Sequence, residues 1–311
     1  MPDPTDITLT TDDAHALAAT WFPPEHGTPH TLLLISSGTG IPRQFYRRFA
    51  AFAASRGFGV LTYDYRGIGG SAPASLRSTS IRYREWGQHD MPAAIAWLRT
   101  RVPDVPLAVV GHSAGGQQLG LAHNVHLVDA ALFVAVSTGY WRDMPTKHRW
   151  FTWALWNLFV PVMRAALGYF PARRFGLGED LPGPVATEWG AWCQEPTYMA
   201  AFFDGTGHAR SPDGEDFGAV HFDRAQLPIH WLCFGDDPIA NPRTVPPLMQ
   251  LYGQANIESQ WVSPRELGVD TIGHLGFFRE SLGASLWPGT LDALRSKAAH
   301  SASEPARALT V

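Results

Sequence analysis

The chain has little cysteine for its length. Two of its 311 residues are cysteines, Cys193 and Cys233, and neither belongs to a CxxC pair or to a metal-type spacing. The sequence therefore offers no disulfide framework and no cysteine metal site. Both thiols are expected to be buried and free, which suits a reducing compartment, and we expect a cytoplasmic protein. The acidic start, MPDPTDITLTTDD, contains no apolar core, so no secretory signal is predicted.

Positive charge and long hydrophobic runs are also scarce. Charged residues make up 17% of the chain, Lys and Arg (24) are fewer than Asp and Glu (28), and the formal net charge is −4. Without a basic block, nucleic acid is not an expected partner. The aromatic run Trp150–Met163 has fourteen residues without a charge but is interrupted by Pro161. That is too short for a bilayer, so no integral membrane segment is predicted.

One stretch with the order strand, sharp turn and helix stands out. The continuous apolar run Leu107–Val110 predicts a short buried strand, and Gly-His-Ser-Ala-Gly follows it directly. Gly111 and Gly115 allow close main-chain approach around a strained residue at the apex, which is Ser113. The first free N–H groups of the next helix then point to the space beside this hydroxyl. The pattern alone also fits an ordinary glycine-rich turn, but its flanking elements favour a nucleophile.

The rest of the chain alternates strands and helices, with one interruption. Strands predicted at 31–35, 59–63 and 131–136 alternate with helices, which predicts an α/β protein with a mostly parallel sheet. The alternation stops between 139 and 222, where two aromatic helical stretches, 150–167 and 186–203, are predicted. We therefore predict a core of residues 1–138 and 223–298, an inserted helical cap at 139–222 and a flexible tail at 299–311.

The Gly111–Gly115 turn resembles the nucleophile elbow of the α/β-hydrolase superfamily. Three further segments, Thr39–Pro42, Asp64–Ser71 and Gly273–Phe278, are similar to segments of its bacterial members of undefined substrate, near the serine aminopeptidase and monoacylglycerol-lipase-like branch. The resemblance implies an α/β-hydrolase fold, a structural role for Asp64–Ser71, and catalysis without a cofactor or metal. It does not imply a substrate.

The family template places a serine, an acid and a histidine in this order, each on a loop after a strand. Asp236 and Asp237 follow the strand predicted at 229–234. Asp237 precedes Pro-Ile, which matches the family's usual step, and is the preferred acid; Asp236 is the alternative and is expected to cap a loop. His274, after the strand predicted at 257–262, is the preferred base among thirteen histidines because glycines lie close to it on both sides.

The resemblance also implies two main-chain donors for the oxyanion. Many family members carry His-Gly in the loop after the third strand, whereas this chain has Ser37-Gly38-Thr39. Because the donor is a backbone N–H, the side-chain difference matters little. We expect the N–H groups of Thr39 and Ala114 to form the oxyanion hole.

Three roles for the aromatic run of the cap stay open. It could pack on the core, it could also wall an apolar substrate pocket, or it could lie on lipid, although its flanks are not strongly basic. Trp150, Trp153 and Trp156, together with Phe151 and Phe159, cannot all face one side of a helix. We therefore expect this helix to be covered on both sides, and the three tryptophans are the candidate pocket residues.

Together these features predict a serine hydrolase that cleaves an ester or thioester of an apolar small molecule through an acyl-enzyme. Ser113 would attack, His274 would carry the proton and Asp237 would orient His274. Acyl transfer by the same residues and a non-catalytic ligand-binding homologue stay as alternatives. The expected partner is a small-molecule acyl substrate, and a homodimer is possible.

Overall fold

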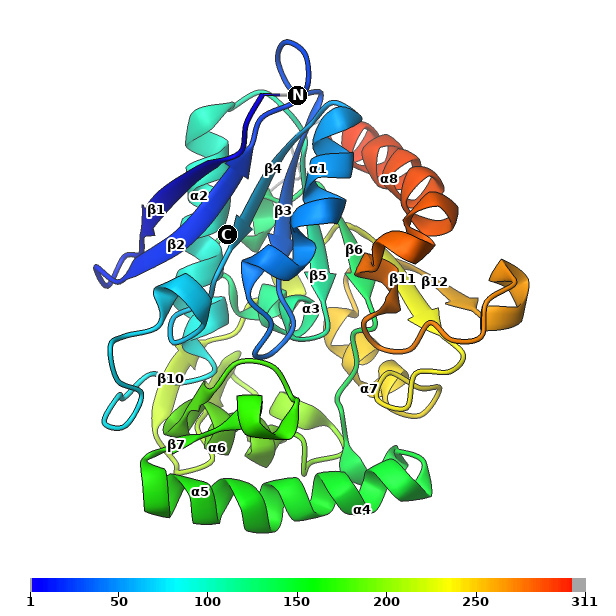
Figure 1. The fold of residues 1–311 in the computed structure, drawn as a ribbon. Coiled ribbons are helices and arrows are strands. Elements are labelled where there is room, and N and C mark those ends of the chain that lie inside the picture. Colours follow the sequence, from blue (N-terminus) through cyan, green and yellow to red (C-terminus); the bar gives the residue numbers. More distant parts are fainter. Residues whose placement is uncertain (1, 304–311) are drawn as a thin grey trace.

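The computed structural model describes residues 2–303, and its centre is an eight-stranded sheet (Figure 1). The strand order is β1-β2-β4-β3-β5-β6-β11-β12, with β1/β2 and β2/β4 antiparallel and all other neighbours parallel. The strands are β1 (Thr5–Thr10), β2 (Ala16–Phe22), β3 (Thr31–Ser36), β4 (Phe58–Tyr63), β5 (Leu107–His112), β6 (Ala130–Val134), β11 (Pro228–Phe234) and β12 (Asn256–Val262).

Helices cover both faces of this sheet (Figure 1). α1 and α8 pack against each other on one face, and α2 and α3 lie on the other. The helices of the core are α1 (Arg47–Ser55), α2 (Met91–Arg101), α3 (Ala114–Gln118), α7 (Val245–Met249) and α8 (Glu280–Ser303). Every residue of β3, β4, β5 and β6 is buried, as expected for parallel strands covered on both faces. The predicted fold class, a mostly parallel α/β-hydrolase sheet with an inserted helical segment, is confirmed.

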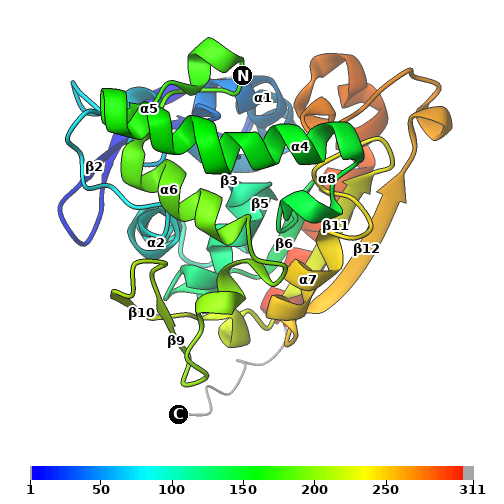
Figure 2. The same ribbon diagram turned by 90° about the horizontal axis from the view of Figure 1, so that it is seen from below.

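A long insertion separates β6 from β11, and we call residues 139–222 the cap segment. It lies beyond the ends of the strands in Figure 1, and Figure 2 shows its longest helical stretch crossing the molecule with α6 beside it. Its elements are α4 (Thr146–Ala154), α5 (Val160–Leu167), β7 (Tyr169–Phe170), β8 (Leu181–Pro182), α6 (Gly183–Trp192), β9 (His208–Arg210) and β10 (Asp216–Ala219). No helix among residues 2–303 is long and apolar enough to cross a membrane.

Pro161 does not break the first cap helix. A π-helical turn, Leu155–Phe159, joins α4 directly to α5, in which Pro161 occupies the first turn. The wider turn supplies the room that a proline ring needs near the preceding carbonyl, and proline is tolerated where its missing N–H has no helical partner. The cap helix is therefore continuous from Thr146 to Leu167.

Two sequence-based boundaries need correction. The helix predicted at 186–203 ends at Trp192 and is followed by a separate 3₁₀ turn, Tyr198–Phe202, in which Tyr198 has a φ of 58°. A positive φ at a bulky residue cannot continue a right-handed helix. The tail predicted at 299–311 is helical at its start, because α8 continues to Ser303. Residues 304–311 lie outside the described residues.

Candidate active site

Ser113 lies at the tip of a tight turn between β5 and α3. Its backbone has φ 49° and ψ −110°, a region that residues with a side chain rarely occupy. The turn is held by the Ser113 N–H, which donates to the Val134 carbonyl of β6 at 3.0 Å. A Cβ added to Gly115 would lie 2.1 Å from the Ser36 carbonyl oxygen, and one added to Gly111 would lie 2.6 Å from a backbone nitrogen. Gly111 and Gly115 thus leave room for the ends of β3 and β5 and the start of α3 to pack closely against one another.

His274 and Asp237 form a hydrogen-bonded pair, with Asp237 on the loop after β11 and His274 on the loop after β12. Asp237 follows β11, and its Oδ2 lies 2.7 Å from His274 Nδ1. The other carboxylate oxygen accepts the N–H groups of Ile239 at 2.8 Å and Ala240 at 3.1 Å. Burial alone would raise the pKa of the Asp237 carboxyl, but the attraction of His274 and these hydrogen bonds hold the pKa below its usual value. The carboxylate stays ionised and can hold a proton on His274 Nδ1.

Asp236 has a different set of partners. Its carboxylate accepts the Thr271 hydroxyl at 2.7 Å and the N–H groups of Ile272 at 2.9 Å and Gly273 at 3.0 Å. These bonds outweigh partial burial and lower the pKa of the Asp236 carboxyl. Asp236 therefore fixes the loop that precedes His274, while the adjacent carboxylate contacts the imidazole itself.

A buried hydrogen-bond chain runs behind Ser113, and we call it the His112 relay. The Gly38 N–H donates to the Tyr46 hydroxyl at 2.9 Å, the hydroxyl lies 2.7 Å from His112 Nδ1, and His112 Nε2 lies 3.0 Å from the His274 carbonyl oxygen. A carbonyl only accepts, so His112 carries its proton on Nε2 and accepts from Tyr46 at Nδ1. Burial, and then the neighbouring His274, lower the pKa of His112 to about 3.

The relay fixes three segments that sequence analysis assigned to the site. Gly38 belongs to the loop after β3, His112 precedes Ser113, and the His274 backbone carries the predicted base. Ser113 and His274 are thus both attached to His112, one through the chain and the other through a hydrogen bond, and no hydrogen bond joins their side chains in the described structure. Hydrogen bonds between catalytic groups are often long or absent without substrate.

The loop after β3 lies against the elbow and carries free donors. The N–H groups of Thr39 and Ala114 have no acceptor in the part of the chain that the structure describes. The Thr39 side chain is occupied, because its hydroxyl lies 3.0 Å from that of Tyr83. The Gly40 carbonyl accepts the N–H of Glu179 at 2.7 Å, so the cap segment is bonded directly to this loop. The N–H groups of Thr39 and Ala114 therefore stay available as donors.

The aromatic residues of the cap helix occupy two opposite faces. Trp156 is buried, with its ring 4.8 Å from that of Trp189. Trp150 and Trp153 are exposed on the outer side of the helix, as is Phe151. The expectation that this helix is covered on both sides is wrong, because only the face that packs on α6 is covered. A pocket role for Trp150 and Trp153 does not fit these exposed positions.

Comparison with known proteins decides the family. The model described as "Alpha/beta hydrolase family" matches residues 26–281, which include Ser113, Asp237 and His274. The chain belongs to this family. No curated protein matches it in sequence.

Solved structures similar to this family member agree with it in fold. A thermostable carboxyl esterase from Bacillus coagulans has a TM-score of 0.62 at 11% identity, with 96% of this chain and 99% of that chain covered. The Pyrococcus furiosus esterase Pf2001 gives 0.57 at 15%, with 95% and 93% covered. A Mycobacterium tuberculosis puromycin-hydrolyzing peptidase gives 0.56 at 17%, with 96% and 39% covered. At these identities the likeness shows the fold alone.

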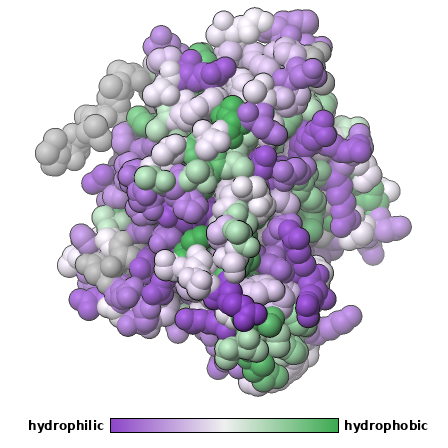
Figure 3. All heavy atoms as spheres, turned by 60° about the vertical axis from the view of Figure 1, so that its left-hand side comes forward, coloured by the Kyte–Doolittle hydropathy of each residue, from purple (hydrophilic) through white to green (hydrophobic). Residues whose placement is uncertain are grey.

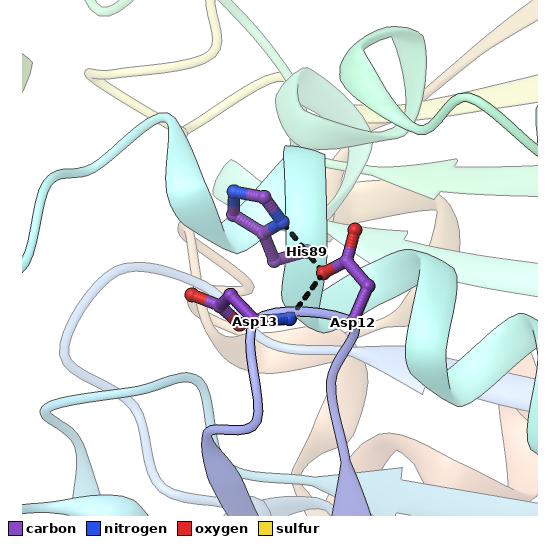
Figure 4. Close-up of side chains that lie close together, drawn as sticks. All are labelled: Asp12, Asp13 and His89. Atoms are coloured by element: carbon purple, nitrogen blue, oxygen red, sulfur yellow. Dashed lines mark hydrogen bonds and ion pairs between the residues drawn. The ribbon is translucent and has the colours of Figure 1, made fainter.

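A second group of ionisable residues lies on the hairpin side of this α/β hydrolase. Figure 4 shows Asp12, Asp13 and His89 close enough to share a metal ion. The Asp13 carboxylate, however, already accepts two N–H groups of Arg66, at 2.7 and 2.9 Å, and His89 Nδ1 lies 2.7 Å from Asp12. A guanidinium in this position opposes a cation. The Asp13–Arg66 ion pair and the contact of Asp12 with His89 therefore tie the β1–β2 turn to the core.

Sequence analysis missed Tyr46 and the role of His112 in this family member. The one available signal was a histidine inside the elbow, directly before the serine. His112 lies buried at the end of β5 between Tyr46 and the His274 backbone. Tyr46 is 66 positions away from His112, so no local pattern connects them.

Proposed function

We propose that this α/β hydrolase is a serine hydrolase that cleaves an ester or thioester of an apolar small molecule through an acyl-enzyme. The observation that supports this most strongly is the 2.7 Å contact of Asp237 Oδ2 with His274 Nδ1, on a backbone that also presents Ser113 in a strained elbow. An ionised carboxylate at Nδ1 leaves His274 Nε2 without a proton. That nitrogen is then the base that a serine nucleophile requires.

The proposed reaction has two stages. Ser113 Oγ attacks the substrate carbonyl carbon while His274 Nε2 takes the hydroxyl proton. The N–H groups of Thr39 and Ala114 stabilise the negative oxygen of the tetrahedral intermediate. His274 returns the proton to the leaving alcohol or thiol, which departs and leaves an ester on Ser113. Water then attacks this ester, His274 takes the water proton, and the acid is released as the serine hydroxyl forms again.

The substrate class is inferred from the same features. An apolar acyl group suits the serine aminopeptidase and monoacylglycerol-lipase-like branch that the motifs resemble, and a helical cap over the strand ends would shelter such a group from water. Both cysteines are buried and free, which supports a cytoplasmic location. Acyl transfer differs only in the final acceptor, because an alcohol or amine would replace water in the second stage.

An active-serine probe tests the proposal directly. We expect a fluorophosphonate to label the native protein at Ser113, and Ser113→Ala to lose both labelling and turnover of p-nitrophenyl esters by several orders of magnitude. Circular dichroism should show an unchanged fold, because alanine keeps the elbow backbone. A serine variant with more than about a tenth of the native turnover would remove Ser113 from the mechanism. Product analysis with an added alcohol separates hydrolysis from acyl transfer, and absence of labelling would favour a ligand-binding homologue.

A further inference from the structure

The outer side of the cap helix is an exposed apolar surface. We define the outer cap face as Trp150, Phe151, Trp153, Leu158 and Val162. Their exposed fractions lie between 41% and 58%. The rings of Trp150 and Trp153 lie 6.3 Å apart, and all five side chains lie along the exposed part of the helix. The opposite side carries the buried residues of the same run, so the stretch Trp150–Met163 presents apolar side chains on both sides.

A surface helix of an isolated globular protein normally carries polar residues on its outer side. Here the outer side also carries two exposed tryptophans and a phenylalanine. Figure 3 shows a continuous hydrophobic patch at the lower end of the molecule, where Figure 1 places α4 and α5, with hydrophilic residues bordering it. A contiguous patch of this kind marks an interaction site.

The charged residues of the segment that carries the outer cap face, Met144 to Gly178, are all basic, and Asp143, Glu179 and Asp180 flank this segment. No Asp or Glu occurs from Met144 to Gly178, although the whole chain has a net charge of −4. The same segment contains five Lys or Arg residues: Lys147, Arg149, Arg164, Arg173 and Arg174. All of them except the half-buried Arg149 are exposed. The nearest acid on the C-terminal side, Glu179, is paired with Arg173. The apolar face is thus bordered by cations on a chain that is acidic as a whole.

We propose that the outer cap face docks on an anionic lipid surface. Exposed tryptophan and phenylalanine side chains favour the boundary between headgroups and acyl chains, and the basic residues beside them would contact the negative headgroups. A second copy of this chain is a poorer occupant, because two such faces brought together would oppose their positive charges. Docking concerns the outer side of the cap, so it is independent of the proposed hydrolysis at Ser113.

Vesicle partitioning of the full chain tests this proposal. The protein is sedimented with vesicles of phosphatidylcholine alone and with an equimolar mixture of phosphatidylcholine and phosphatidylglycerol. We expect partition onto the mixed vesicles, a blue shift of tryptophan emission, and release by added salt. Absence of binding to the mixed vesicles, or equal binding to both kinds, would overturn the proposal.

Surface variants locate the contact. Phe151→Gln with Leu158→Gln should weaken partition by roughly tenfold or more, because both side chains would leave the lipid. Lys147→Gln with Arg174→Gln should also weaken partition, by roughly fivefold for each charge removed. The matched control is Trp261→Gln on β12, where the native tryptophan is 37% exposed, and it should bind as the native protein does.

Two further results would contradict lipid docking. The first is an equal loss of partition in the Trp261→Gln control. The second is a native dimer, measured by sedimentation equilibrium, that Phe151→Gln with Leu158→Gln converts to a monomer, since the face would then be a subunit interface. Ester turnover is measured in parallel without vesicles. All surface variants should retain turnover, so a failed docking test is distinguishable from a failed hydrolase assignment.

Discussion

Protonation of His112 should make the stability of this protein depend on pH. The imidazole is fully buried, accepts from Tyr46 and donates to the His274 carbonyl. Its pKa falls from 6.5, the value for an unfolded chain, to about 3 in the folded protein. At a pH between these two pKa values, the His112 side chain is protonated in the unfolded state and neutral in the folded state. Stability from His112 is therefore complete above about pH 6.5 and is lost progressively as the pH falls toward 3.

The size of the effect follows from the two pKa values. Each pH unit below the unfolded value costs about 1.4 kcal/mol. Because pH 5 lies about one and a half units below the unfolded pKa, His112 should remove about 2 kcal/mol of the unfolding free energy at pH 5 relative to pH 7. That is a large part of the roughly 5–15 kcal/mol typical of a folded domain.

The measurement compares urea unfolding of the native protein and His112→Gln at pH 7, 6 and 5, followed by tryptophan fluorescence. Glutamine keeps an amide N–H to donate toward the His274 carbonyl but does not titrate. His15, His221 and His230, whose pKa values are also lowered by burial, are present in both proteins and cancel in the comparison. We expect the native protein to lose about 2 kcal/mol more than the variant between pH 7 and 5. Parallel losses in the two proteins would refute a buried neutral His112.

Three further changes probe the site and its support. Asp237→Asn should lower ester turnover about 10³- to 10⁴-fold, because the amide no longer holds the proton on Nδ1 of the His274 imidazole. Asp236→Asn should keep turnover within about tenfold of the native value. Equal losses of the two variants in steady-state assays would contradict separate roles for the two aspartates. Gly115→Ala should cost more than about 3 kcal/mol in urea unfolding, since its Cβ would lie 2.1 Å from a β3 carbonyl oxygen, while Gly235→Ala, with no contact closer than 3.8 Å, should be nearly neutral. Tyr46→Phe should lower the unfolding free energy by about 2–4 kcal/mol, because it leaves a buried N–H and an imidazole nitrogen unpaired; an unchanged urea midpoint would show that water replaces the hydroxyl.

Much of the fold could be predicted because its signals are local. The run Leu107–Val110 is continuous and apolar because β5 is buried on both faces. The glycines around Ser113 indicate a close approach of backbone segments that a side chain would prevent. The order of strands and helices likewise follows from periodicity within short windows. The roles of Ser113, Asp237 and His274 stay predictions, although the structure brings the last two into contact.

The rest depends on contacts between distant segments. Nothing near Tyr46 in the sequence indicates that its hydroxyl meets His112. Likewise, Tyr198, whose positive φ prevents a helix that continues to 203, donates to Gln117, 81 positions away. The exposed tryptophans of the cap were misjudged for a different reason. Periodicity shows that Trp150 and Trp156 point in different directions, but it does not show which direction has a neighbour. Burial on both sides was assumed for hydrophobic residues, and the structure covers only one side.

The hydrogen bond between Glu179 and Gly40 has a consequence for chimaeric proteins in which the cap segment is replaced by that of another member of the family. The Glu179 N–H donates to the Gly40 carbonyl at 2.7 Å. This bond holds the cap segment to the loop next to the elbow, at a point far along the chain from both ends of the segment. A chimaera that kept both junctions but lacked an N–H donor at this point would leave the Gly40 carbonyl without its partner. The loop would then be free to shift, and Thr39 with it. A transplanted insertion must therefore reproduce this bond, and others such as those of Tyr198 with Gln117 and of Glu188 with Arg84, as well as its two junctions.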